Sequence, residues 1–122
     1  MKLQDVHGVI SKLLDAKLKP ILTEEKKLNL VTCVEIYTTI FETLVEVAEA
    51  SELPVGNEAM NYLAQQYYDG VLVNGNEELD PNIFTQRAKV EEIETKELAV
   101  LAVILYGTDF ALPLIAEIKR RQ

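Results

Sequence analysis

The chain has 122 residues, of which 48% are hydrophobic, and a net charge of −8 at neutral pH. This length predicts a single domain over residues 1–122, with a core large enough to fold without disulfides or metals. Residues 51–100 carry ten acidic and three basic side chains, which argues against phosphate contacts and therefore against a nucleic-acid partner. The only cysteine, Cys33, cannot form an internal disulfide and indicates a reducing compartment, so we predict a cytoplasmic protein.

The first predicted helix covers about residues 5–18, where apolar side chains recur at helical spacing. Asp5 can cap its start, whereas Gly8 weakens its interior by roughly 1 kcal/mol relative to alanine. Because Pro20 disfavours helical geometry at the residue before it, a turn is predicted at residues 19–22. So short a turn makes the next helix an antiparallel neighbour of the first.

The longest predicted helix covers residues 23–50, with Thr23 as its cap and no glycine or proline inside. Its principal apolar stripe, which we expect to face the core, consists of Leu30, Val34, Tyr37, Phe41, Leu44 and Ala48. A second apolar set widens this surface and consists of Val31, Ile36, Ile40 and Val47. The charged face, expected to meet water or a partner, consists of Glu35, Glu42, Glu46 and Glu49.

A third helix is predicted to begin at Asn57 and to stop at Asp69-Gly70. Residues 71–73 are apolar and lead into Asn74-Gly75, a pair typical of tight turns. We therefore predict an irregular or β segment near residues 70–93. Two alternatives are open for it: a hairpin that pairs residues 71–73 with 83–90, or an Ω-like loop.

Two further helices are predicted towards the end of the chain. The first begins near Thr95, is apolar on every side and therefore central, and ends at Gly107 in a left-handed conformation. The second tolerates Pro113 only in its first turn. Gly107, Asp109 and Pro113 also interrupt the apolar stretch 98–118, so no membrane span is predicted.

The predicted fold is thus a mainly α, single-domain bundle of about five helices. We expect one core that contains Leu30, Val34, Phe41, Leu44, Leu101 and Leu105.

No pattern of catalytic residues is recognisable. His7 is the only histidine, and neither it nor Ser11, Ser51 or Cys33 stands in a nucleophile motif or at metal-ligand spacing. The carboxylates best placed for metal or acid–base chemistry are Glu91, Glu92, Glu94 and Glu97. Neither a di-iron nor an EF-hand pattern accompanies them, so we predict no enzyme, no metal and no cofactor.

Tyrosines near the middle of the chain are either part of the core or exposed contact anchors. The residues with the composition of a partner-binding surface are Glu35, Glu42, Glu46, Glu49, Tyr62, Tyr68, Glu91, Glu92 and Glu94.

Three parts of the sequence show a further pattern: the start KLQDVHGVISKLLDAKLKPIL, the long helix that ends at Ala50, and the late segment KVEEIETKELAVLAVIL. In these parts the sequence resembles small helical proteins of tailed bacteriophages, among them tail assembly chaperones and phage domains of unknown function. The resemblance implies a cytoplasmic, non-enzymatic protein that binds another protein or itself.

We therefore predict a protein–protein interaction or assembly module that forms homo-oligomers and serves phage or prophage morphogenesis. The first alternative is an acidic inhibitor or nucleic-acid mimic that binds a basic host protein. The second alternative is a small carboxylate-dependent enzyme.

Overall fold

The computed structural model describes residues 2–23, 30–73, 83 and 86–122. They form the helices α1 (Leu3–Thr23), α2 (Leu30–Ala50), α3 (Asn57–Val73), η1 (Val90–Glu92), α4 (Thr95–Ile104) and α5 (Ala111–Arg121). Within these described ranges no strand is present, so the mainly helical prediction is confirmed. The predicted Asn74-Gly75 turn lies outside the described residues.

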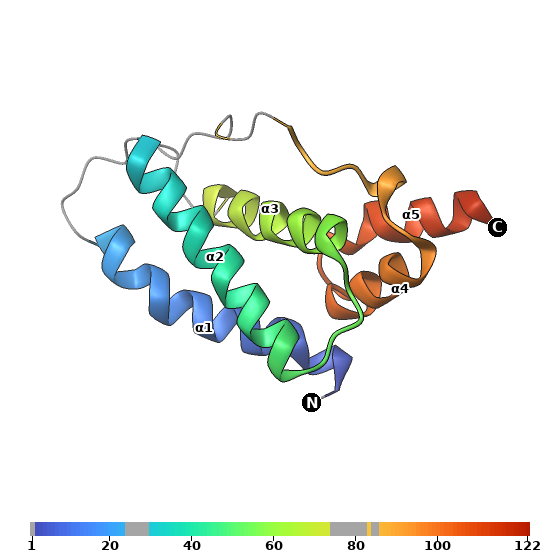
Figure 1. Cartoon of the computed structure of the whole chain (residues 1–122), viewed down its shortest axis with the longest axis horizontal. Coiled ribbons are helices and arrows are strands. Elements are labelled where there is room, and N and C mark those ends of the chain that lie inside the picture. Colours follow the sequence, from blue (N-terminus) through green and yellow to red (C-terminus); the bar gives the residue numbers. More distant parts are fainter. Residues whose placement is uncertain (1, 24–29, 74–82, 84–85) are drawn as a thin grey trace.

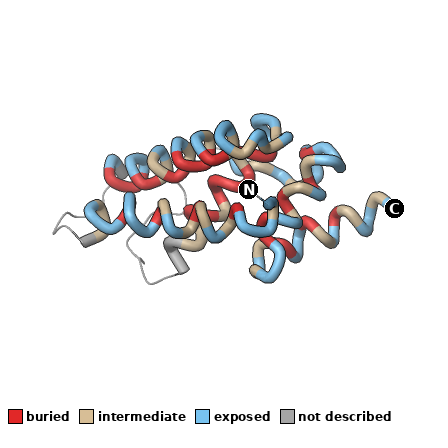
Figure 2. The backbone as a smooth tube through the Cα atoms, turned by 90° about the horizontal axis from the view of Figure 1, so that it is seen from below, coloured by how far each residue is buried: buried red, intermediate tan, exposed pale blue. Residues whose placement is uncertain are grey.

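Helices α1 and α3 both pack on α2, and the shorter α4 and α5 lie at one end of these three (Figure 1). Helices α1 and α2 run antiparallel side by side, and α3 packs on α2 (Figure 1). Helices α4 and α5 pack on each other, while α4 also contacts α1 and α3. The buried faces of the helices are turned towards one another in Figure 2, and the core takes residues from all five α-helices.

The buried face of α2 differs from the predicted principal stripe. Its fully buried apolar residues are Cys33, Ile36, Ile40, Leu44 and Val47. Val34 of the predicted stripe is 47% exposed, and Val31 of the second set is 75% exposed. The core stripe is therefore shifted by one position, which is about 100° around a helix. The sequence does not reveal this shift, because the buried stripe includes Cys33 and the polar residue Thr43. The buried hydroxyl of Thr43 donates a hydrogen bond to the Thr39 carbonyl.

The predicted core is therefore only partly correct. Leu44, Leu101 and Leu105 are buried in one cluster, as predicted. Phe41 is only half-buried, and Val34 does not belong to the core. The side chain of Leu30 lies outside the described residues.

Helix α1 was predicted to end before Pro20, but it continues to Thr23. Proline removes one helical hydrogen bond and costs about 3 kcal/mol inside a helix. The carbonyl that loses its donor belongs to Ala16, which is exposed, so water can satisfy it. Ile21 and Leu22 pack against the core beyond Pro20, and their burial offsets part of this cost. The predicted turn at residues 19–22 and the role of Thr23 as a cap are thus wrong.

Helix α3 begins at Asn57, as predicted, but continues past Asp69-Gly70 to Val73. The extended conformation predicted for residues 71–73 is therefore wrong. Gly70 faces the Phe110 ring, and a Cβ atom there would lie 3.4 Å from it, at ordinary van der Waals contact. Asp69 forms an ion pair with Arg87 at 2.5 Å, so it ties the helix to a later segment of the chain.

Backbone geometry accounts for two helix ends. After α2, Glu52 has a left-handed φ of 51°, and the Leu53 N–H bonds to the Ala48 carbonyl at 3.0 Å. This pattern is a Schellman closure with glutamate in place of the usual glycine. After α4, Gly107 has a φ of 88°, which confirms the predicted left-handed glycine.

Helix α4 lies at the end of the bundle. Its composition predicts a helix enclosed on all sides, and this prediction is wrong. Leu98, Leu101 and Ile104 are buried, whereas Val103 is 43% exposed. In α5, Pro113 lies in the first turn, as predicted. Among the described residues, none of the helices combines the length and the apolar character needed to cross a bilayer.

Candidate functional site

The four glutamates of the predicted charged face on α2 are all exposed: Glu35, Glu42, Glu46 and Glu49. Glu46 forms an ion pair with Lys17 of α1 at 3.1 Å. Lys17 and Glu46 are both solvent-exposed, so this ion pair contributes little to stability. The acidic stripe is therefore open to water along the outer side of the α1–α2 pair.

The structure removes Tyr62 and Tyr68 from the predicted contact set, because both are buried in the core. The Tyr68 ring packs edge-on against Tyr37, with ring centres 6.2 Å apart. Burial, followed by the nearby charges of Asp69 and Glu91, raises the pKa of Tyr62. These tyrosines fill the core, which was the other interpretation of their sequence pattern.

Glu91, Glu92 and Glu94 are exposed on and just after η1. Arg121, the last residue of α5, fixes this segment. Arg121 donates hydrogen bonds to the carbonyl oxygens of Ile93 at 2.8 Å, Glu91 at 3.1 Å and Val90 at 3.4 Å. One guanidinium thus holds the acidic segment against α5, a contact that the sequence did not predict.

The arginine is oriented by Glu117, one turn earlier on α5. Glu117 is buried and accepts hydrogen bonds from Arg120 at 2.5 and 2.9 Å and from Arg121 at 2.9 Å. These bonds, first those from Arg120, lower the pKa of Glu117 to about 2, although its burial acts in the opposite direction. Glu117 therefore stays ionised and holds both arginines in place.

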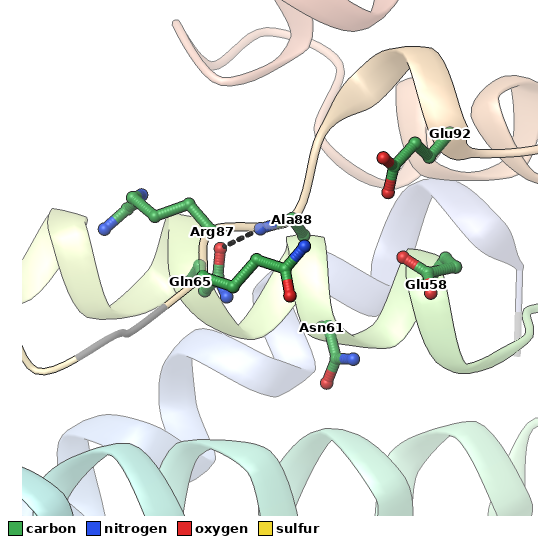
Figure 3. A pocket seen from close by; sticks show the side chains of 7 residues that line it. Glu58, Asn61, Gln65, Arg87, Ala88 and Glu92 are labelled. Carbon is green, nitrogen blue, oxygen red and sulfur yellow. Dashed lines mark hydrogen bonds between the residues drawn. The ribbon is translucent and has the colours of Figure 1, made fainter.

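A polar trough is formed where this acidic segment passes α3. We define it by Glu58, Asn61 and Gln65 on α3 together with Ala88 and Glu92 on the opposite wall (Figure 3). Its volume is about 140 Å³. The Gln65 side-chain oxygen accepts a hydrogen bond from the Ala88 N–H at 2.8 Å, which ties the two walls of the trough together. Of the predicted contact residues, the trough contains Glu92.

A second cavity, of about 250 Å³, lies between α1, α3 and Phe110. Within it the Nδ1 atom of His7 is 2.6 Å from the Tyr67 hydroxyl, and the two rings are stacked. Burial lowers the pKa of His7 and raises that of Tyr67. Ser11 lines the same cavity. His7 thus has a structural partner in Tyr67, a contact that no pattern in the sequence indicates.

Exposed apolar side chains gather where α4 meets α5. We call this surface the α4–α5 corner and define it by Val103, Tyr106 and Leu112. Tyr106 is 81% exposed and Leu112 63% exposed. The two side chains line one shallow depression, together with Ile115. Sequence reasoning missed this surface because it placed the whole segment in the core.

Among the described residues there is no group of three or more His, Cys, Asp or Glu side chains that could hold a metal ion. Glu97, the fourth carboxylate considered for chemistry, accepts a hydrogen bond from the Gly56 N–H and so joins α4 to the α2–α3 connection. That the protein is not an enzyme stays a prediction.

A scan against protein-family models finds no matching family, and searches of curated proteins and of solved structures find no match either.

Proposed function

We propose that the protein is a non-enzymatic assembly module that associates with a second copy of itself through the α4–α5 corner. The observation that carries this proposal is the exposure of Tyr106 and Leu112 at one depression. A large exposed aromatic beside an exposed leucine is typical of an interface anchor rather than of a solvated surface. A two-fold axis would place the Tyr106 ring of each copy in the depression of the other.

The charge distribution supports a second copy as the occupant of this corner. Each chain carries a net charge of −8, so two copies repel each other over most of their surface. Residues 101–122 are the exception, with three basic and two acidic side chains. Association through this C-terminal segment therefore costs least in electrostatic repulsion.

The phage resemblance of the sequence adds a biological setting to this proposal, namely an accessory role in phage or prophage morphogenesis in the cytoplasm. Self-association is the part that can be tested directly on the purified protein. Sedimentation velocity should give a dimer for the wild type and a monomer for Tyr106→Ser and for Leu112→Ser. Loss of one large contact side chain at the centre of an interface typically weakens binding by about 2 kcal/mol or more.

The matched control is Val31→Ser, because Val31 is 75% exposed but lies on α2, away from the corner. This variant should remain dimeric. A wild-type monomer mass across a hundredfold concentration range would refute self-association. Dissociation in Val31→Ser but not in Tyr106→Ser would assign the interface to the start of α2.

The acidic stripe of Glu35, Glu42, Glu46 and Glu49 favours a second candidate function, an acidic inhibitor or mimic that binds a basic host protein. All four carboxylates are exposed on one helix face. Binding through such a stripe depends on charge and loses affinity steeply as the salt concentration rises. Self-association through the apolar corner should instead strengthen with salt, because salt screens the repulsion between two acidic chains.

A further inference from the structure

We propose that the polar trough between α3 and the Ala88–Glu92 segment binds an arginine side chain presented by a partner peptide. This site is separate from the α4–α5 corner, so it does not depend on self-association. Three properties of the trough lead to this assignment: its carboxylates, the donor group of Gln65, and its size.

The first property is the set of oxygen acceptors around the opening. Glu58 stands on α3 and Glu92 on the opposite wall, with the Asn61 amide below them (Figure 3). Neither glutamate forms an ion pair with any residue in the described part of the chain. A guanidinium is planar, carries five N–H donors and bonds to carboxylates in pairs, so it matches acceptors on two facing walls.

The second property is the amide group of Gln65. Gln65 is only 5% exposed, and its oxygen is committed to the Ala88 N–H. The NH₂ group makes no hydrogen bond to a described residue. Since no fully buried side-chain polar atom of the described residues lacks a partner, this group reaches solvent through the trough. The NH₂ group of Gln65 is a hydrogen-bond donor. A peptide carbonyl can accept a hydrogen bond from it, whereas a bare cation cannot.

The third property is the volume. At about 140 Å³ the trough is smaller than the roughly 300–1,000 Å³ of typical small-molecule and cofactor sites. It holds only a few water molecules, or the head group of one side chain. Arg87 also lines the trough, but its guanidinium is paired with Asp69 and points away from Glu58 and Glu92 (Figure 3). The position for a cation is therefore left to a partner.

The test uses the full chain and three probes in NMR titrations of its backbone amides. The probes are acetyl-Ala-Arg-Ala-amide, the same peptide with lysine in place of arginine, and methylguanidinium. We expect the arginine peptide to shift amides of Glu58, Gln65, Ala88 and Glu92. It should bind about tenfold tighter than the lysine peptide, because only the guanidinium bonds to two carboxylates at once. Methylguanidinium lacks the carbonyl for Gln65 and should bind about tenfold more weakly.

Variants locate the site. Glu58→Gln and Glu92→Gln should each weaken the arginine peptide about tenfold, which is the effect of one charge-assisted pair. Asp5→Asn is the control, since it removes another exposed carboxylate, on α1, and it should change affinity less than about twofold. Equal binding of the lysine peptide, or an equal loss in Asp5→Asn, would overturn the site. If methylguanidinium bound with the same affinity as the arginine peptide, a peptide would not be the occupant of the trough.

Discussion

The orientation of α2 can be tested by truncating one residue on each face of the helix. Ile40 is fully buried, whereas Val31 is 75% exposed. Ile40→Ala removes three buried carbon atoms and should cost about 2–5 kcal/mol. Val31→Ala should change the free energy of unfolding by less than about 0.5 kcal/mol. With a denaturant slope of about 2 kcal/mol/M, Ile40→Ala should lower the urea midpoint by about 1–2.5 M.

The assay is urea unfolding followed by far-UV circular dichroism, in the Tyr106→Ser background so that dissociation of a dimer does not contribute. Phe41→Ala provides an intermediate case, because Phe41 is half-buried. Its cost should fall below the roughly 3–5 kcal/mol of a fully buried phenylalanine. If Val31→Ala lowered the midpoint as much as Ile40→Ala does, the buried face of α2 would be wrongly assigned.

Three further outcomes follow from the backbone and from titrating groups. Gly8→Ala should stabilise by about 0.5–1 kcal/mol, since nothing lies within 4 Å of a Cβ atom there, and Gly107→Ala should destabilise by about 1–2 kcal/mol because its φ is 88°. If thermal unfolding showed that Gly8→Ala destabilises the protein or that Gly107→Ala stabilises it, these expectations would be wrong. The lowered pKa of Glu117, about 2, means that its stabilisation is complete above about pH 4.5 and is lost as the pH falls towards 2. Glu117→Gln should therefore show a flatter urea midpoint between pH 5 and 2. The lowered pKa of His7 means that stability falls as the pH drops below 6.5, and His7→Gln should remove that fall.

Local signals in the sequence located much of the helical framework. The start at Asn57, the left-handed Gly107 and the first-turn Pro113 depend on the conformation of one or two residues, which the residue type reveals. Pro20 failed as a stop signal because tertiary packing decides whether a costly residue is tolerated. The face of α2 failed for a related reason. Thr43 reads as polar, yet its hydroxyl is satisfied inside the helix and its side chain is buried.

The candidate sites were much less predictable than the helices. His7 and Tyr67 are 60 residues apart, and no periodicity indicates that pair. Arg121 reads as a cation that complements the end of α5, but its hydrogen bonds go to carbonyl oxygens of η1. The trough likewise requires the Ala88–Glu92 segment to lie on α3. Of the trough residues, the sequence indicates only Glu92, because its exposure and charge are properties of the local sequence.

The two proposed surfaces should respond to salt with opposite signs, because different forces hold their partners. The trough attracts a cation through Glu58 and Glu92, and salt screens that attraction. At the α4–α5 corner, salt screens the repulsion between two chains of charge −8 and leaves the burial of Tyr106 and Leu112 intact. Raising NaCl from 50 to 500 mM should therefore weaken the arginine peptide and strengthen the dimer. A dimer that dissociates with salt would instead be held by ion pairs between acidic and basic side chains, and the corner would not be its interface.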